Sequence, residues 1–316
     1  MVLLEVRDLK TYYYTLKGIV RAIDGISFAL DEGRVLGIAG ESGCGKSTLG
    51  YSLMKLVPPP GKIVGGDIVI DGKNVMLMNE DSVRREIRWK LISMVFQGAL
   101  NALNPVYTVG KQLVEPIIYH EGLSFKEAYE RASEVIKEVG LHEDVLSRYP
   151  HELSGGMKQR VMIAMALVLR PKLIIADEPT TALDVIIQAQ IMNLFKKIKN
   201  ELKQSLIFVT HDLSLIAEIA DYVGVMYAGK IAEYGISDII FNNPSHPYTQ
   251  GLLKSIPRLK VKEKIVWIPG SPPDLRNPPK GCRFHPRCPY VMDICRSEEP
   301  PLKDLGGGHL TSCWLY

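Results

Sequence analysis

Short apolar runs separated by polar residues fill the first quarter of the chain, a pattern typical of strands. Three strands are predicted in this way: Val2–Val6, Gly25–Leu30 and Val35–Ala39. The third leads directly into a glycine-rich stretch, and a helix is predicted after it over Ser47–Leu56, where Pro58 and its neighbours end it. Gly66–Gly72 predicts a strand followed by a tight turn. We therefore expect an antiparallel arm beside a parallel core.

The middle of the chain changes to helical spacing of its apolar residues. This spacing extends from about Asn101 to Ala164 and is clearest over Phe125–Val139, so a helical insert is expected. A further amphipathic helix is predicted from about Ile186 to Leu202. It separates two apolar strands of the kind that is buried inside a parallel sheet, Leu173–Ala176 and Leu206–Thr210.

The last third of the chain begins with a predicted hairpin and ends in a segment of different composition. Val223–Tyr227 and Ile231–Tyr234 predict two strands joined by a short turn. After about Phe241, prolines recur from Pro244 to Pro286, which predicts a loop-rich tail without a core of its own.

Composition and charge change this picture little. Apolar residues make up 46% and charged residues 23% of the 316 residues, as in ordinary globular proteins. The net charge of +3 gives no whole-chain argument for nucleic-acid binding, and we expect no nucleic-acid partner. The longest apolar run, Val161–Leu169, is half a membrane span and is expected to be a buried helix. Because the N-terminus lacks the layout of a signal peptide, any work at a membrane is expected to proceed from the cytosol through partners.

The glycine-rich stretch Gly40–Ser47 matches the phosphate-loop pattern G-x-x-x-x-G-K-S/T, and it lies between a predicted strand and a predicted helix. Its glycines let backbone N–H groups converge on phosphates, and the helix presents its positive end. Lys46 is expected to reach the β- and γ-phosphates, and Ser47 to bind Mg²⁺. The residues expected to contact ATP here are Gly40, Ser42, Gly43, Cys44, Gly45, Lys46, Ser47 and Thr48.

Two acidic residues follow the apolar strand Leu173–Ala176. Asp177, at the strand end, suits the coordination shell of Mg²⁺, and Glu178 suits a general base that polarises an attacking water. Two solvated acids at a strand end would be the simpler interpretation. The phosphate loop and the helix-breaking Pro179 favour the catalytic one.

A second glycine motif, Leu153-Ser154-Gly155-Gly156, begins a predicted helix. Ser154 is a good N-cap, and the two glycines allow the backbone to approach an anion closely. The order of phosphate loop, this motif, the acidic pair and then His211 resembles the ATP-binding-cassette (ABC) ATPase, the motor subunit of ABC transporters.

That resemblance implies ATP and Mg²⁺ as cofactors and assigns roles that single residues do not reveal. Gln97 would contact Mg²⁺ and the attacking water, and His211, between Thr210 and Asp212, would contact the γ-phosphate. Tyr13 would stack on adenine, with the adjacent tyrosines as alternatives.

The same resemblance implies that the motor is a dimer. Ser154, Gly155 and Gly156 would meet the ATP bound by a second ABC ATPase subunit, whether an identical chain or a relative. Asp184 would belong to the loop that links the two ATP sites. Closure on ATP, hydrolysis and reopening would then be one cycle.

A finer resemblance, to the oligopeptide/dipeptide importers, lies in Phe96–Val106, Tyr149–Glu152 and His246–Gln250. Gly98 and Ala102 depart from the usual Asp and Ser of that pattern. The implied partners are two integral membrane permease subunits and, indirectly, an extracytoplasmic solute-binding protein. The implied location is the cytoplasmic face of the cell membrane. Peptides are the expected cargo; nickel or oligosaccharides, or a soluble ABC ATPase outside transport, remain alternatives.

Four of the five cysteines fall in the tail: Cys282, Cys288, Cys295 and Cys313. Clustered thiols in a cytosolic protein suggest a metal rather than disulfides. Their spacing is wider than that of common zinc knuckles, and four thiolates suit an iron–sulfur cube. Zinc is the alternative, and reduced thiols are the third.

The tail also resembles the C-terminal region of the same importers, where four cysteines are associated with a 4Fe–4S cluster. We expect such a group to staple the tail rather than to transfer electrons. Arg283, Arg287 and Arg296 either form a solvated face or help to hold an acidic cluster or a partner.

The predicted architecture is therefore an α/β phosphate-loop ABC ATPase core with an antiparallel β arm and a helical subdomain. The nucleotide-binding domain is expected over residues 1–240, with the helical subdomain at about 98–165. A proline-rich C-terminal extension with the four cysteines is expected over 241–316.

Overall fold

The computed structural model describes residues 1–98, 102–255 and 268–316. Within them the chain forms two compact units, Met1–Met76 with Phe208–Tyr316, and Leu77–Ile207. Ala99, Leu100 and Asn101, in the importer-like segment, lie outside the described residues, as do residues 256–267 of the predicted tail. The boundary at residue 240 stays a prediction.

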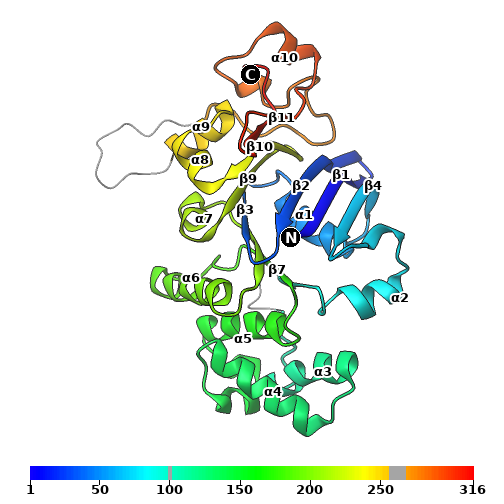
Figure 1. Ribbon diagram of the computed structural model, residues 1–316, viewed down its shortest axis with the longest axis vertical. Helices are drawn as coiled ribbons and strands as arrows, with labels where there is room; N and C mark the ends of the chain where they lie inside the picture. Colours follow the sequence, from blue (N-terminus) through cyan, green and yellow to red (C-terminus); the bar gives the residue numbers. More distant parts are fainter. Residues whose placement is uncertain (99–101, 256–267) are drawn as a thin grey trace. The chain divides into compact units, whose positions relative to one another are not determined.

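The first unit contains the predicted antiparallel arm, a four-stranded sheet in the order β2-β1-β4-β5 (Figure 1). Its strands are β1 (Val2–Thr15), β2 (Gly18–Asp31), β4 (Gly61–Ile70) and β5 (Lys73–Asn74). Both β1 and β2 are longer than predicted, because Tyr12 and Tyr13 pair with Arg21 and Val20 across the hairpin. Aromatic residues fit a pleated surface well, which favours this extension.

The same unit contains the strand that leads into the phosphate loop. β3 (Val35–Ala39) is wholly buried and pairs in parallel with β9 (Tyr222–Tyr227), which forms the predicted hairpin with β10 (Lys230–Ile236). Helix α7 (Leu213–Ile219) packs on β3 at Gly37, where an added Cβ would lie 2.3 Å from Ile216 Cγ2. A glycine at this position thus allows close helix–strand packing.

The C-terminal tail is more structured than its prolines suggest. It contains α8 (Ser237–Asn242), α9 (Pro247–Lys254), η6 (His285–Arg287), α10 (Asp293–Ser297), β11 (Lys303–Asp304) and β12 (Leu310–Thr311). β12 pairs with β10, so the orange-to-red segment of Figure 1 extends the sheet of the first unit. Tyr248 and Phe284 of the tail are 0% and 3% exposed, and both rings contact Tyr227 of β9. The tail is therefore packed on the first unit, and the expectation that it lacks a core of its own stays a prediction.

The second unit holds the predicted helical insert. Its main helices are α3 (Val109–Glu121), α4 (Phe125–Glu138), α5 (Gly155–Leu167) and α6 (Val185–Asn200). β6 (Ile92–Val95) and β7 (Leu173–Asp177) pair in parallel, both buried along their length. Shorter elements are η1 (Val75–Leu77), at the boundary between the units, α2 (Glu80–Ser82), η2 (Val83–Ile87), η4 (Glu143–Ser147) and η5 (Pro150–Glu152). β8 (Ser205–Val209) contains the residue at which this unit ends.

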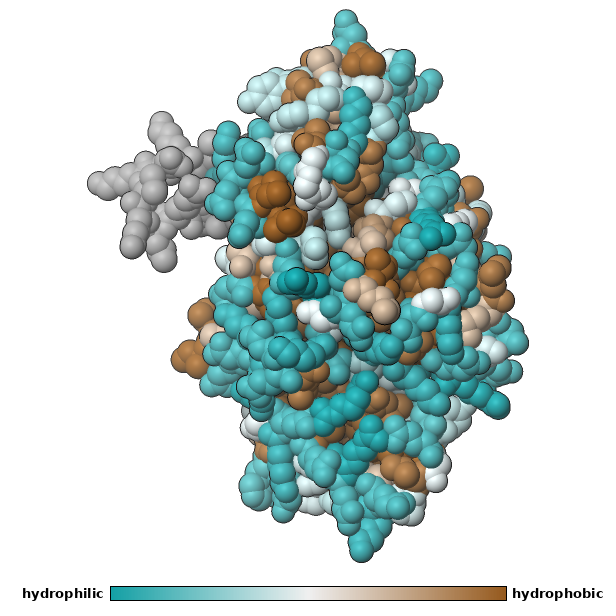
Figure 2. Space-filling view, in the orientation of Figure 1, coloured by the Kyte–Doolittle hydropathy of each residue, from teal (hydrophilic) through white to brown (hydrophobic). Residues whose placement is uncertain are grey.

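Sequence pattern explains where these helices begin. Ser124 accepts a hydrogen bond from the backbone of Glu127, whose carboxylate accepts from the Ser124 N–H, so a capping box starts α4. Most of the apolar run Val161–Leu169 lies in α5, and all of it except the half-buried Met165 is buried, in line with the prediction. Among the described residues, no helix is long and apolar enough to cross a membrane. The face drawn in Figure 2 is mostly hydrophilic, with apolar residues in small groups.

Candidate functional site

The phosphate loop connects β3 to α1 (Lys46–Leu53) in the first unit. Gly45 caps the helix with φ 108°, and an added Cβ there would lie 2.2 Å from the carbonyl oxygen of Ala22. Gly40 has φ 150°, and its Cβ would lie 2.3 Å from Met226 O. Both positions therefore require glycine, and the loop is held against its neighbours closely enough to fix its curvature.

Lys46 is 6% exposed, and its ammonium lies inside the loop. Its Nζ donates to the carbonyl oxygens of Gly40 at 2.7 Å and Glu41 at 3.1 Å. Ser42 and Gly43 are exposed at the tip, while Ser47 and Thr48 are half-buried. The Cys44 thiol is buried within the loop, and burial raises its pKa, so it packs there as a neutral group.

Of the three adjacent tyrosines, Tyr13 contacts the residue that follows the loop. Its hydroxyl is 3.5 Å from Thr48 Oγ1, directly after the phosphate loop. Tyr12 instead donates to Asp24 Oδ1 at 2.6 Å, and Tyr14 is 46% exposed. The position of Tyr13 favours it over its neighbours as the aromatic residue beside a bound nucleotide.

His211 also belongs to the first unit. It follows β8 and is exposed, between Thr210, whose N–H donates to Ile38 O at 3.2 Å, and Asp212, which caps α7 through Ser214 N at 2.9 Å. The backbone on either side is thus fixed to β3 and α7. His211 is therefore an exposed residue on a fixed stretch of backbone.

In the second unit, the structure brings Gln97 and Glu178 together. Asp177 is the last residue of β7 and is 0% exposed. Glu178 follows it with φ 45°, and its Oε2 accepts from Gln97 Nε2 at 3.0 Å and from Thr181 Oγ1 at 2.9 Å. A left-handed backbone at a non-glycine residue is strained, and such strain is typical of functional sites.

The second glycine motif has the predicted helix start. Ser154 is the N-cap of α5, accepting from Met157 N at 3.4 Å, and Ser154 and Gly155 are exposed. An added Cβ at Gly156 would lie 3.0 Å from Ile187 Cγ2. Asp184 caps α6 through Ile187 N at 2.9 Å. The motif therefore presents backbone N–H groups at an exposed helix N-terminus.

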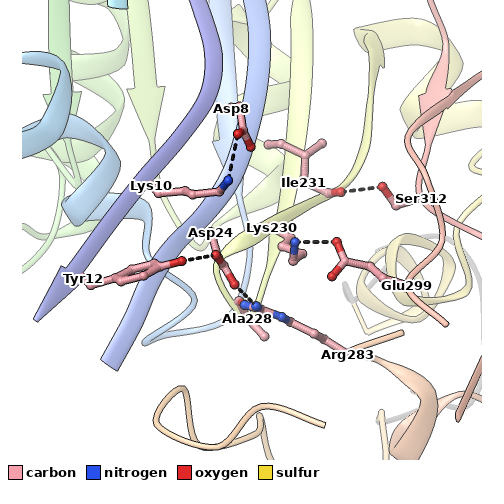
Figure 3. Close-up of polar contacts among 10 residues, drawn as sticks. All are labelled: Asp8, Lys10, Tyr12, Asp24, Ala228, Lys230, Ile231, Arg283, Glu299 and Ser312. Carbon is pink, nitrogen blue, oxygen red and sulfur yellow. Dashed lines mark hydrogen bonds and ion pairs between the residues drawn. The ribbon is translucent and has the colours of Figure 1, made fainter. Parts of the chain in front are cut away.

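Two arginines of the tail, Arg283 and Arg287, are buried, so they do not form the solvated face that was one of the two alternatives. Arg283 is 7% exposed and donates to Ala228 O and to the Asp24 carboxylate (Figure 3). Burial alone would raise the pKa of Asp24, but the hydrogen bond from Tyr12 and the charge of Arg283 hold it below its usual value. Arg287 is 6% exposed and bonded to Glu41. Arg296 is exposed.

Sequence reasoning missed both contacts. The only signal in the sequence was that each arginine stands beside a cysteine. The tail is so far from the phosphate loop along the chain that sequence position does not indicate which residue an arginine contacts. Figure 3 also shows Lys230 paired with Glu299, and Ser312 Oγ donating to Ile231 O at 3.0 Å. The tail is thus attached to β10 and to the β1–β2 hairpin by side chains at several points.

The four tail cysteines are free thiols within electrostatic range of one another. Burial raises the pKa of Cys282 to about 11, with smaller contributions from the other three. Cys282 N also donates to Cys295 O at 2.9 Å. Among the described residues, however, no group of three or more His, Cys, Asp or Glu side chains is arranged to hold a metal ion. The number of cysteines and their closeness to one another would suit a metal ion. The arrangement of the described side chains does not.

Comparison with known proteins gives two matching family profiles. One is described as "ABC transporter" and matches residues 23–181. The other is described as "Oligopeptide/dipeptide transporter, C-terminal region" and matches residues 232–295.

Relatives resemble the whole chain. The oligopeptide transport ATP-binding protein OppD of Bacillus subtilis is 48% identical, covering 99% of this chain and 88% of that protein. OppD of Escherichia coli is 46% identical over 99% of this chain and 93% of its own. The dipeptide transport ATP-binding protein DppD of Caldanaerobacter subterraneus is 46% identical over 100% and 97%.

Solved structures give the same fold. A dimeric bacterial ABC transporter cassette is 30% identical with a TM-score of 0.67, covering 74% of this chain and 99% of that one. A dimeric ATP-binding cassette in a post-hydrolysis state, bound to ADP and Pi, has a TM-score of 0.65 at 30% identity and the same coverage.

Proposed function

Because this chain belongs to the ATP-binding subunits of oligopeptide/dipeptide ABC transporters, we propose how its residues act in the motor of a peptide importer. The chain is an ATPase coupled to peptide transport. The observation that carries this assignment is the likeness to peptide-transport ATP-binding proteins over 99% of the chain, tail included. The tail separates this group from ABC cassettes in general, which share the core motifs.

The nucleotide is held by the first unit's loop. Backbone N–H groups from Gly40 to Ser47 receive the phosphates, and Lys46 leaves its contacts with the loop carbonyls to reach the β- and γ-phosphates. Tyr13 stacks on the adenine. Ser47, Asp177 and Gln97 supply oxygen atoms, the ligands that Mg²⁺ prefers, and the buried strand-end position of Asp177 supports this set. Mg²⁺ held by these residues would neutralise charge on the phosphates.

Hydrolysis uses Glu178 as the general base. Its carboxylate accepts a proton from the attacking water, while the amide of Gln97, 3.0 Å away, fixes the carboxylate orientation. His211 donates to the γ-phosphate and stabilises the charge that develops there. The support for these roles is the Gln97–Glu178 contact and the strained backbone at Glu178.

The motif at Ser154–Gly156 acts on a second ABC ATPase subunit, identical or related. Its exposed N–H groups bind the γ-phosphate held by that subunit, so ATP closes the dimer and hydrolysis reopens it. Asp184 links the two sites. The dimeric state of the similar cassettes supports this proposal.

Closure drives two integral membrane permease subunits from the cytoplasmic face, and an extracytoplasmic solute-binding protein delivers the peptide. To test this, tagged Glu178→Gln would be expressed in the native cell and recovered with ATP from solubilised membranes. Multi-span permeases should co-purify with the tagged chain. Recovery of soluble partners alone would refute the transport partners.

The four tail thiols form our proposed metal site, with a 4Fe–4S cluster first and zinc second, supported by their number and proximity. The side chains would have to rearrange on binding, because the described residues are not arranged around a metal ion. The role of the site is to staple the tail, since the ATP site needs no electron transfer. Anaerobic purification, a visible spectrum and iron and zinc analysis decide between the two. Cys295→Ala should lose the metal, and Cys44→Ala, a matched change outside the tail, should keep it. A colourless protein with one zinc refutes the cluster, and a metal-free protein refutes both.

A further inference from the structure

Arg287 reaches the phosphate loop from the far end of the chain. It ends the short helix η6, between Cys282 and Cys288. Its Nη1 and Nη2 donate to the two carboxylate oxygens of Glu41 at 2.6 and 2.9 Å, across 246 residues of sequence. Two parallel hydrogen bonds between a guanidinium and a carboxylate fix both distance and orientation.

The guanidinium is held in this place by further contacts. Its Nε donates to Pro269 O at 2.8 Å, and Nη1 lies 3.4 Å from the hydroxyl of Tyr227. Arg287 Cζ lies 5.8 Å from the centre of the Tyr227 ring. The side chain of Arg287 is 5% exposed and that of Glu41 is 26% exposed. Solvent and salt therefore screen this pair less than a surface ion pair.

Glu41 is fixed at its backbone as well. Its N–H donates to the hydroxyl of Tyr248 at 2.9 Å, and its carbonyl oxygen accepts from Lys46. Burial raises the pKa of Tyr248, so the phenol remains neutral. Burial also lowers the pKa of His246 to about 4, so its neutral ring can accept from Tyr248 N at 3.0 Å. The second residue of the loop is thus anchored to the tail through main chain and side chain.

The carboxylate of Glu41 poses an electrostatic problem in an anion-binding loop. Glu41 is the second residue of the loop whose N–H groups receive phosphates, and like charges repel. A guanidinium at 2.6 Å cancels that charge without competing for the phosphates, because both of its Nη groups are bonded to Glu41.

We propose that Arg287 is a positioning residue for nucleotide binding, which acts by neutralising the Glu41 carboxylate so that the phosphate loop can accept an anion. The proposal rests on the proposed ATPase function and goes beyond it, because it makes the affinity of the loop depend on the cysteine-bearing tail. It assigns the tail a part in the ATP site that does not require any metal.

The two partners of the pair should change affinity in opposite directions, and this is the test. Mg-ADP binding to the purified full chain would be measured by titration calorimetry, since ADP contacts the loop without hydrolysis or dimer closure. Arg287→Gln should weaken binding about tenfold, a typical coupling between sites, because it leaves Glu41 uncompensated. Glu41→Gln should bind at least as tightly as the unchanged chain. The double variant should recover most of the loss, and Arg287→Lys, which keeps the charge, should lose less.

Steady-state ATP hydrolysis gives a second readout. Arg287→Gln should raise KM about tenfold and change kcat little, because the proposed effect is on binding. Arg276→Gln, which removes an exposed tail arginine paired with Asp274, is the matched control and should change neither. Thermal unfolding of each variant separates lost folding from lost affinity.

Unchanged ADP affinity in Arg287→Gln would refute the proposal, as would a double variant that binds as weakly as Arg287→Gln. Weaker binding in both single variants would also overturn it, since a purely structural pair weakens when either partner is removed. None of these outcomes bears on the proposed role of Glu178. That role would fail if Glu178→Gln kept a near-normal kcat, and this measurement does not depend on ADP affinity.

Discussion

Glu41 and Glu178 are the carboxylates that we propose to act in nucleotide binding and in hydrolysis, and their described hydrogen-bond donors differ in charge. Glu41 is bound by a guanidinium from the tail, through two hydrogen bonds to a side chain that is 5% exposed. Glu178 accepts from two uncharged groups, the amide of Gln97 and the hydroxyl of Thr181. A cation cancels a carboxylate charge, whereas uncharged donors orient it and leave it basic.

This difference in hydrogen-bond donors explains how glutamate can have two different proposed roles. At Glu41 the carboxylate connects the loop to the tail, and its charge must be removed from the phosphate field. In the role proposed for Glu178 the negative charge is needed, because a general base takes a proton from the water. The partner, and not the glutamate, decides which role applies.

The strongest way to break the comparison is Glu178→Gln. The amide cannot accept a proton, so ATP hydrolysis should slow on the order of 10²–10⁴-fold while ATP binding persists. Steady-state hydrolysis and nucleotide titration measure the two effects separately. The variant should also dimerise when ATP is added, which light scattering would detect. Near-normal turnover would remove Glu178 from the mechanism.

A second variant gives Glu178 a negatively charged partner in place of Gln97. In Gln97→Glu two carboxylates would meet at the position of a 3.0 Å hydrogen bond, and such a pair retains one proton more readily than a single carboxylate. Hydrolysis at neutral pH should fall about 10–100-fold, as for loss of an orienting group. The acidic limb of the rate profile should move to higher pH, because the base must be deprotonated to act. Gln97→Ala is the control, and should lose rate without that shift.

The position of Glu178 at a strand end was predictable and the ion pair of Glu41 was not, for a physical reason. Glu178 follows a buried strand and belongs to a local pattern, as do the loop glycines and the N-cap Ser154. Local patterns are predictable because they follow from the backbone conformation at the residue itself; the positive φ of Gly45, for example, favours glycine. The partner of Glu41 lies 246 residues away, and no local rule selects Arg287 over the other arginines.

The fold divides in the same way. Buried strands such as β3 and β7 and the helix start of α4 follow from apolar runs and a capping box. The tail does not, because its two-residue strand β12 is stabilised by pairing with β10 and not by its own propensity. The length of β1 likewise comes from cross-strand pairs at Tyr12 and Tyr13.

A third variant removes the backbone hydrogen bond between Glu41 and Tyr248. Tyr248→Phe removes the acceptor of the Glu41 N–H at 2.9 Å and leaves a part-buried donor without its partner. The free energy of unfolding should fall by about 1–3 kcal/mol. Chemical denaturation followed by tryptophan fluorescence measures this change. ADP affinity should fall less than in Arg287→Gln, since the charge of Glu41 stays cancelled; an equal or larger fall would show that the backbone contact dominates.

The smallest change tests whether the orientation of Glu178 depends on each of its donors. Thr181→Val keeps the shape of the side chain and removes the hydroxyl that donates to Glu178 Oε2 at 2.9 Å. A single hydrogen bond of this kind contributes about 0.5–1.5 kcal/mol, which corresponds to roughly a two- to tenfold loss in kcat. The loss should lie at the lower end, because Gln97 still holds the same oxygen at 3.0 Å. Stopped-flow measurement of phosphate release would resolve it, with Thr181→Ser as the control that keeps the donor. If Thr181→Val slows hydrolysis as much as Glu178→Gln, the hydroxyl does more than orient the base, and the contrast with Glu41 must be drawn on other grounds.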